Sequence, residues 1–98
     1  MARNVETETT IIKDVGVGSR GAVIRVSRVK YPKTGTETLD IRKFDFDKED
    51  KLAPTYKGIS ITSEVLPEVL KAVILGLSTE ERIDLLAELS DLDELQTN

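Results

Sequence analysis

The sequence contains neither cysteine nor histidine among its 98 residues. Without cysteine the chain can form neither disulfides nor thiolate metal sites, which is typical of an intracellular protein. Without histidine, the usual zinc sites, the Ser-His-Asp and Cys-His nucleophile systems and a near-neutral imidazole base are excluded as well. We therefore expect a protein that is not an enzyme and that uses no cofactor and no metal.

Long apolar runs are also missing. No run approaches the length of about 20 residues that a bilayer crossing requires, and residues 1–10 lack the apolar core of a signal peptide. We expect a soluble, unprocessed intracellular protein that does not associate with a membrane. The length of 98 residues is that of one small domain, which can fold alone but gains from association.

The net charge of −4 conceals an uneven distribution of charge along the chain. Residues 1–58 contain twelve Lys or Arg and nine Asp or Glu, a balance of +3, whereas residues 59–98 contain two and nine, a balance of −7. Within residues 20–43, seven basic residues are accompanied only by Glu37 and Asp40. This asymmetry favours a face that binds a polyanion and an acidic segment that avoids it. A solvated surface with uneven statistics is the alternative.

Short β-branched and alternating runs, separated by glycine, proline and polar residues, dominate the first part of the chain. Such runs predict strands, and the turn residues between them predict an antiparallel meander. A polar loop is expected over residues 47–56, before the last of these runs. The expected strands are residues 9–18, 22–31, 36–46 and 57–61.

The pattern changes after the fourth expected strand. Apolar residues recur at helical spacing from Leu66 to Leu77, where Thr62 or Ser63 can cap the start and Pro67 falls in the first turn. Further apolar residues widen the apolar surface beyond one face, and a helix of this kind must bury more than one face. One side can cover the sheet, and the other needs the last helix or a second subunit.

A second helix is expected at the C-terminus. Ser78 and Glu81 fit a capping box, in which each side chain satisfies a free backbone N–H of the other residue. Leu85, Leu89 and Leu92 then recur at a heptad-like spacing that is too short for a coiled coil by itself. Residues 91–98 are expected to form a loose acidic end, which either recruits a basic partner, competes with a polyanion or is merely solvated.

Two motifs resemble ligand sites but lack the required context. Residues 16–21 match G-x-G-x-x-G, yet a strand follows where a dinucleotide loop requires a helix, so we expect a hairpin connection. Residues 45–50 resemble the start of a calcium loop, yet the positions that need glycine and glutamate are Asp50 and Tyr56. We expect a solvated loop and no metal there.

The expected strand over residues 36–46 carries charge and aromatic rings on one side. Side chains alternate along a strand, so Leu39 and Ile41 point to one face. The other face carries Asp40, Arg42, Phe44 and Phe46. Guanidinium groups beside flat rings suit unpaired nucleic acid, because they neutralise phosphates while the rings stack on exposed bases. Phe44 or Tyr31 could instead belong to the core. The candidate residues are Arg25, Arg28, Lys30, Tyr31, Lys33, Arg42, Phe44 and Phe46.

Residues 39–62, LDIRKFDFDKEDKLAPTYKGISIT, resemble the signature of the positive cofactor 4 type transcriptional coactivators. The D-I-R element and the following aromatic residue stand at residues 40–42 and Phe44, and K-G-I-S-I stands at residues 57–61. Residues 25–35 resemble the preceding strand and turn of the family, with Tyr31 at its stacking aromatic position. The resemblance spans roughly residues 11–77.

The resemblance implies an α+β fold in which a four-stranded curved antiparallel sheet is followed by a helix, here with a second C-terminal helix. It also implies a homodimer formed through the first helix, with single strands of DNA running across concave sheets. By the same resemblance, Arg42 and Lys57 would meet phosphates and Tyr31 would meet a base.

The chain departs from the family pattern at several positions. The family's tryptophan falls at Asp45, and we expect Phe46 to take its place. An arginine before the aromatic residue of the second strand aligns with Val29, so Arg28 or Lys30 could substitute, and a basic loop position is Ala53. No Ser- and Lys-rich N-terminal region is present, and the second helix is extra, which favours a bacterial or bacteriophage version.

The sequence thus predicts a flexible N-terminus over residues 1–8, a DNA-binding sheet with a dimerisation helix over 9–77, and an acidic C-terminal helix over 78–98. Its expected function is sequence-tolerant binding of single-stranded DNA in transcription, replication or recombination. A protein of one of these processes is a possible partner through the acidic end. The alternative is a regulatory dimer that binds proteins through its apolar helices and acidic tail, with the sheet as scaffold.

Overall fold

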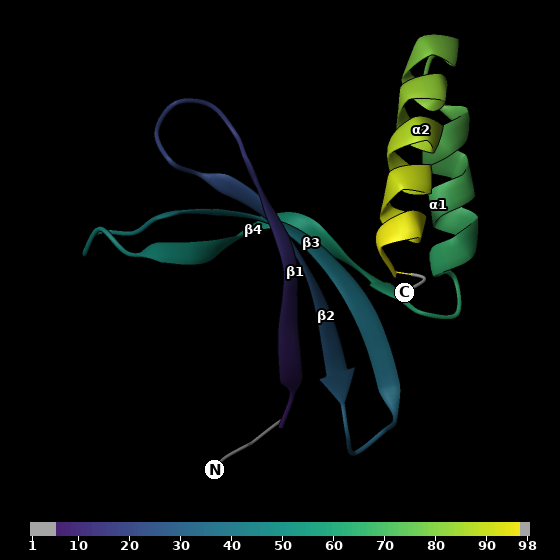
Figure 1. Ribbon diagram of the computed structural model, residues 1–98. Coiled ribbons are helices and arrows are strands. Elements are labelled where there is room, and N and C mark those ends of the chain that lie inside the picture. Colours follow the sequence, from purple (N-terminus) through teal and green to yellow (C-terminus); the bar gives the residue numbers. More distant parts are fainter. Residues whose placement is uncertain (1–5, 97–98) are drawn as a thin grey trace. The chain divides into compact units, whose positions relative to one another are not determined.

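The computed structural model describes residues 6–96, which form a four-stranded antiparallel sheet followed by two helices (Figure 1). This arrangement confirms the α+β architecture that the alternating and helical patterns predict. The strands are β1 (Glu8–Gly16), β2 (Val23–Tyr31), β3 (Thr36–Phe46) and β4 (Leu52–Thr62), and the helices are α1 (Leu66–Leu75) and α2 (Thr79–Gln96).

The chain divides into two compact units. The first extends to Leu66 and contains the sheet, and the second begins at Pro67 and contains the helices. Of the N-terminal segment that was expected to be flexible, residues 1–5 lie outside the described residues, and β1 already begins at Glu8. Among the described residues, no helix combines the length and hydropathy that a membrane crossing requires.

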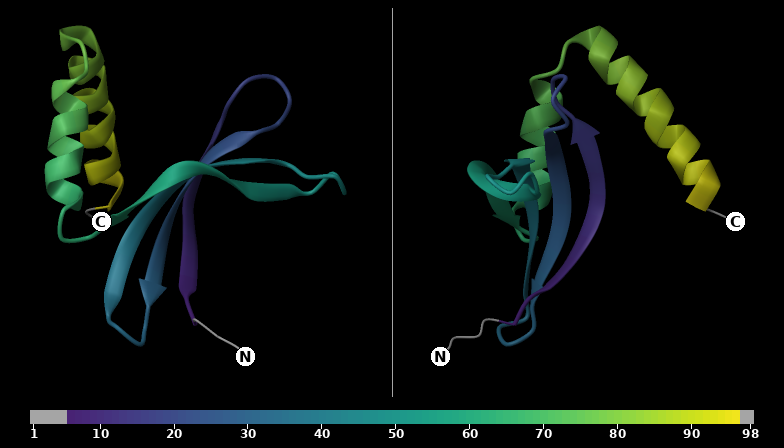
Figure 2. Two further views of the ribbon diagram at one scale, coloured as in Figure 1. Left: turned by 180° about the vertical axis from the view of Figure 1, so that it is seen from behind. Right: turned by 90° about the vertical axis from the view of Figure 1, so that its left-hand side faces the viewer.

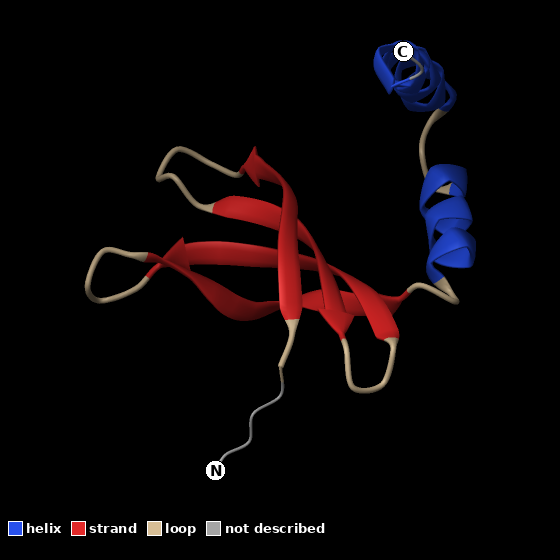
Figure 3. Cartoon of the chain, turned by 60° about the horizontal axis from the view of Figure 1, so that its bottom comes forward, coloured by secondary structure: helices blue, strands red, loops and turns tan. Residues whose placement is uncertain are grey.

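The sheet is a simple meander in which each strand pairs with the next one along the chain, in the order β1-β2-β3-β4. The strands bow along their length (Figure 2). The β1–β2 and β3–β4 loops lie at one end of the sheet and the β2–β3 turn at the other (Figure 3). The G-x-G-x-x-G motif begins at Gly16, the last residue of β1, and continues into the β1–β2 loop, where Gly18 and Gly21 adopt positive φ, so the expected hairpin connection is confirmed.

The core of the described chain is small. Ala22 and Ile61 are the only apolar side chains of residues 6–92 that are buried. Ser27 and Thr38 are buried as well, and the Thr38 hydroxyl has no hydrogen-bond partner. Because apolar burial is the main favourable term in folding, so small a core leaves a single chain with little stabilisation of this kind.

Strand β4 begins earlier than the sequence pattern predicts. The expected polar loop over residues 47–56 is in fact a short turn, because Asp47 Oδ1 accepts the backbone N–H groups of Glu49 (2.8 Å) and Lys51 (3.0 Å) and Asp50 adopts a φ of 63°. The strand then starts at Leu52. A proline such as Pro54 is tolerated in β4 because β4 is an edge strand of the sheet. One side of an edge strand has no neighbouring strand with which a backbone N–H could bond.

Helix α1 begins later than predicted, and the expected caps at Thr62 and Ser63 are wrong. Strand β4 continues through Thr62, whose carbonyl accepts the Val65 N–H in a turn. Ser63 Oγ accepts a hydrogen bond from Arg28 instead (3.3 Å). The helix therefore starts only at Leu66.

Helix α2 begins with the predicted capping box. The Ser78 N–H donates to Glu81 Oε1 (2.8 Å), and the Glu81 N–H donates to Ser78 Oγ (3.1 Å). The Arg82 guanidinium donates to the carbonyls of Leu77 (3.1 Å) and Leu75 (3.4 Å). Residues 91–96 are helical, so the prediction of a loose acidic end is wrong for them, and residues 97–98 lie outside the described residues.

Candidate nucleic-acid interface

The register of the sheet decides which of the predicted side chains share a face. Strands β2 and β3 pair without interruption, with Arg25 opposite Arg42 and Tyr31 opposite Thr36. Directly opposite residues project to the same side, and side chains alternate along each strand. The odd-numbered residues of β2 therefore share a face with the even-numbered residues of β3. We call this surface the Arg42 face; of the predicted site residues it carries Arg25, Tyr31, Arg42, Phe44 and Phe46.

Arg42 lies in a hydrogen-bond network that spans β3 and β4. Its Nε and Nη2 donate to the carboxylate of Asp40 (3.2 and 3.0 Å), and its Nη1 donates to the Thr55 carbonyl (3.0 Å). Ser60 Oγ donates to the same carboxylate (2.6 Å). Burial alone would raise the pKa of Asp40, but the hydrogen bonds from Arg42 and Ser60 and the positive charge of Arg42 outweigh it, so the pKa is lowered. The network fixes the orientation of Arg42 on the sheet.

Arg25 is held in a second ion pair on the same face. Asp14 of β1 stands directly opposite Arg25 and accepts from its Nε (2.8 Å) and Nη2 (3.0 Å). The hydrogen bond from Arg25 lowers the pKa of Asp14, so this carboxylate is ionised at neutral pH. The guanidinium carbon of Arg25 also lies over the ring of Phe44, 4.4 Å from its centroid. Both predicted guanidinium groups on this face are thus paired with a carboxylate.

The aromatic rings of the Arg42 face remain accessible to different degrees. Phe46 is 43% exposed and packs against the β1–β2 loop, where a Cβ added to Gly21 would lie 3.0 Å from the ring. Tyr31 and Phe44 are half-buried. The even spacing of Arg42, Phe44 and Phe46 along β3 keeps all three on one side, as the sequence predicts, whereas Asp45 at the family's tryptophan position faces the other side.

Arg28 and Lys30 are separated from the Arg42 face. Both are even-numbered residues of β2, so they project to the opposite side, where each pairs with Glu37 (3.2 and 4.0 Å). Val29, in contrast, lies on the same side as Arg25 and Tyr31. Neither neighbouring basic residue therefore shares a face with Val29, and the substitution of Arg28 or Lys30 for the family's arginine stays a prediction. Lys33 lies in the β2–β3 turn.

Lys57 lies in an irregular part of β4. The pairing of β3 with β4 shifts between Arg42 and Phe44, so that the segment between Pro54 and Gly58 bulges out of the ladder. Lys57 is exposed there. The neighbouring Tyr56 is 89% exposed and was missed by the sequence reasoning, which placed it in a loop. An aromatic residue directly before a candidate phosphate ligand is the signal that could have identified it.

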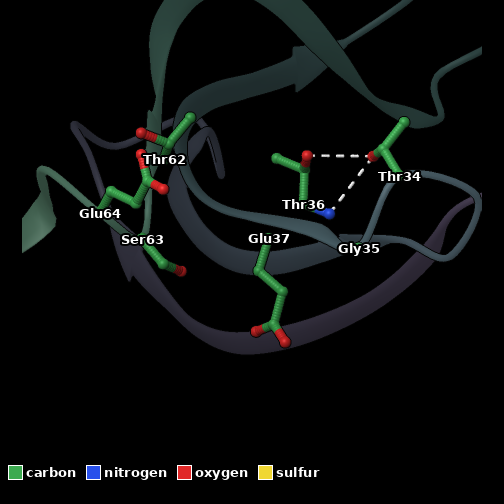
Figure 4. A pocket seen from close by; sticks show the side chains of 7 residues that line it. All are labelled: Thr34, Gly35, Thr36, Glu37, Thr62, Ser63 and Glu64. Carbon is green, nitrogen blue, oxygen red and sulfur yellow. Dashed lines mark hydrogen bonds between the residues drawn. The ribbon is translucent and has the colours of Figure 1, made fainter.

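A hollow lies where the β2–β3 turn meets the end of β4 (Figure 4). Thr34 Oγ1 lies 3.0 Å from Thr36 Oγ1 and accepts the Thr36 N–H (3.3 Å). The lining side chains offer hydroxyl groups and two carboxylates but no basic group, so the hollow does not suit a phosphate. Its lining residues are Thr34, Gly35, Thr36, Glu37, Thr62, Ser63 and Glu64.

The strands that form the Arg42 face belong to a segment that is similar to a known protein family. The model of the family described as Transcriptional Coactivator p15 (PC4) matches residues 19–72, which is more than half of the chain. The match includes β2, β3, β4 and most of α1, and it leaves out β1 and α2. It confirms the resemblance that the D-I-R and K-G-I-S elements indicate. No curated protein and no solved structure matches the chain.

Proposed function

Because the chain belongs to the transcriptional coactivator p15 (PC4) family, we propose that it binds single-stranded DNA on the Arg42 face of its sheet, with little sequence preference. The family is one of non-enzymatic DNA-binding coactivators. The observation that carries the proposal is that two guanidinium groups and three aromatic rings share one face of β2 and β3. Such a surface offers partners to phosphates and to unpaired bases at the same time.

In the proposed mechanism, cationic side chains bind phosphates and flat rings stack on bases. Arg42 keeps N–H groups beyond those bonded to Asp40 and Thr55, and these donate to a phosphate, as does the exposed ammonium group of Lys57. Tyr31 and Phe46 stack on bases, each contact stabilising the complex by about 1 to 3 kcal/mol. Duplex DNA hides its base faces in the stack, so these contacts favour single strands.

We further propose that the chain acts as a homodimer formed through α1. The small core of the described chain leaves apolar surface without a partner, and α1 has no buried residue. Apolar residues exposed on a helix are stabilised when a second copy covers them. The large apolar residues exposed on α1 are Leu70, Val73, Ile74 and Leu75.

The cellular role that we propose is the protection or presentation of melted DNA in transcription, replication or recombination, in a bacterial or bacteriophage setting. The acidic helix α2, with seven Asp or Glu and one Arg over residues 79–96, would bind a basic protein of one of these processes. The alternative function, a regulatory dimer that binds proteins through its helices, is favoured by the exposed Ile83, Leu86, Leu89 and Leu92 of α2.

A fluorescence anisotropy titration distinguishes the two functions. The protein is added to labelled oligothymidine and, separately, to a labelled duplex of the same length. We expect much tighter binding to the single strand, because only its bases are free to stack. Binding to neither would support the protein-binding alternative, and equal binding to both would contradict stacking.

A further inference from the structure

Arg25 is fixed on the sheet by two neighbours from two different strands. The Asp14 carboxylate accepts from Nε and Nη2 of the guanidinium at 2.8 and 3.0 Å, and the Phe44 ring lies beneath its central carbon at 4.4 Å. Asp14 lies in β1, outside the residues that the family model matches. The side chain of Arg25 nevertheless remains 21% exposed.

This arrangement changes what Arg25 can offer to DNA. The adjacent carboxylate offsets the positive charge of the guanidinium, so the pair attracts a phosphate less than a free arginine does. The covered side of the Phe44 ring is not available to a base, because Arg25 occupies it. What remains is the planar surface of the guanidinium itself, and guanidinium planes stack well because they are delocalised and weakly hydrated.

We propose that Arg25 is a stacking platform for a DNA base, oriented by Asp14 and supported from below by Phe44. A base would lie on the side of the Arg25 guanidinium that faces away from the Phe44 ring. The ring, the guanidinium and the base would then form one continuous stack. Because the ion pair already holds the side chain in one conformation, little rotamer freedom is lost on binding. Asp14 is a positioning residue, and the inference rests on the proposed binding of single-stranded DNA.

The test compares oligothymidine with an abasic strand of equal length, which keeps the phosphates and lacks the bases. Arg25→Lys retains the charge but removes the plane. We expect it to weaken binding to oligothymidine about tenfold, the range of one lost base contact, and to leave binding to the abasic strand unchanged. Asp14→Asn should also weaken binding to oligothymidine while leaving binding to the abasic strand unchanged or slightly stronger.

Arg82→Lys is the control, because it makes the same exchange of a guanidinium group for an ammonium group in α2, outside the sheet that carries the proposed interface. It should bind both strands as the wild type does, and circular dichroism should show that all variants are folded. Equal losses on both strands for Arg25→Lys would mean that Arg25 binds phosphate, and no loss on either would mean that it does not bind DNA; both overturn the inference. Tighter binding of Asp14→Asn to oligothymidine would overturn the positioning role. Failure of the wild type to bind oligothymidine would instead overturn the proposed function, and the inference with it.

Discussion

Arg42 and Tyr31 lie on one face, but Arg42 is proposed to bind a phosphate and Tyr31 a base. The salt dependence of DNA affinity distinguishes these two kinds of contact. Each phosphate that a cationic side chain neutralises releases counterions from the single strand and contributes about −0.7 to the slope of log affinity against log salt concentration. About four such contacts therefore give a slope near −3. Arg42→Ala should lower the affinity for oligothymidine and reduce the magnitude of this slope by about 0.7. The measurement is a set of titrations over a range of salt concentrations.

Tyr31→Ala serves as the contrasting variant in the same titrations. A lost base contact should lower the affinity by about 1 to 3 kcal/mol and leave the slope nearly unchanged, because no ion is released. Lys71→Ala, which removes an exposed charge from α1, controls for net charge. Equal slopes for the wild type and Arg42→Ala would count against the phosphate role of Arg42.

Asp40 should make stability depend on pH in the acid range. Its pKa is lowered in the folded chain, so between the folded and unfolded pKa values the unfolded chain binds more protons, and acid favours unfolding. The stabilisation is complete above the unfolded pKa of about 3.9 and is lost as pH falls through the folded value. Urea unfolding at several pH values should therefore show that the stability difference between wild type and Asp40→Asn shrinks below about pH 4. A constant difference would show that Asp40 gains nothing from its ion pair.

Part of the site was predictable from the sequence, because the side chains of a strand alternate between its two faces. Arg42, Phe44 and Phe46 are two residues apart, so any regular strand brings them to one side. The sequence could not show that Asp14 stands opposite Arg25, because this depends on the register between β1 and β2, in which a shift occurs after Ile11. Counting basic residues consequently overestimated the positive charge of this face.

At the scale of the element, the close approach of the β3 backbone to Gly58 explains why the K-G-I-S segment of β4 needs glycine. A Cβ at this position would lie 2.7 Å from the Ile41 carbonyl oxygen and 2.8 Å from the Arg42 Cα, both backbone atoms that cannot move aside. Gly58→Ala should therefore lower the free energy of unfolding by about 1 to 3 kcal/mol, measured by urea denaturation.

Gly16→Ala is the control for this substitution, because a Cβ there meets nothing within 4 Å. Its stability should stay within about 0.5 kcal/mol of the wild type. A Gly58→Ala variant as stable as the Gly16→Ala variant would show that β3 and β4 can move apart at Gly58 without loss of stability.

Elements with strong local signals were predictable, and boundaries set by tertiary contacts were not. The capping box at Ser78 depends only on residues three positions apart, and the structure has it as the sequence predicts. The start of β4 depends on the turn that Asp47 organises and on the tolerance of an edge strand for Pro54. The start of α1 depends on Ser63, which bonds Arg28 across the sheet instead of capping the helix.

At the scale of the whole molecule, the proposal of a dimer through α1 makes a prediction about mass. In sedimentation at micromolar concentration the wild type should have about twice the chain mass of 10.9 kDa. Val73→Asp places a charge among the exposed apolar residues of α1 and should yield a monomer, because burying an unpaired carboxylate is costly. Lys71→Ala, on the same helix, should remain dimeric. A wild type that stays monomeric at every concentration tested would contradict the dimer.

Photocrosslinking to an oligothymidine that contains iodouracil tests the Arg42 face most directly, because the halogenated base reacts preferentially with aromatic side chains that stack against it. Mass spectrometry of the crosslinked peptides identifies these residues. We predict that the crosslinks fall on Tyr31 and Phe46, since both lie on that face. Crosslinks confined to the helices, or to strand residues that project from the opposite face, would contradict the account.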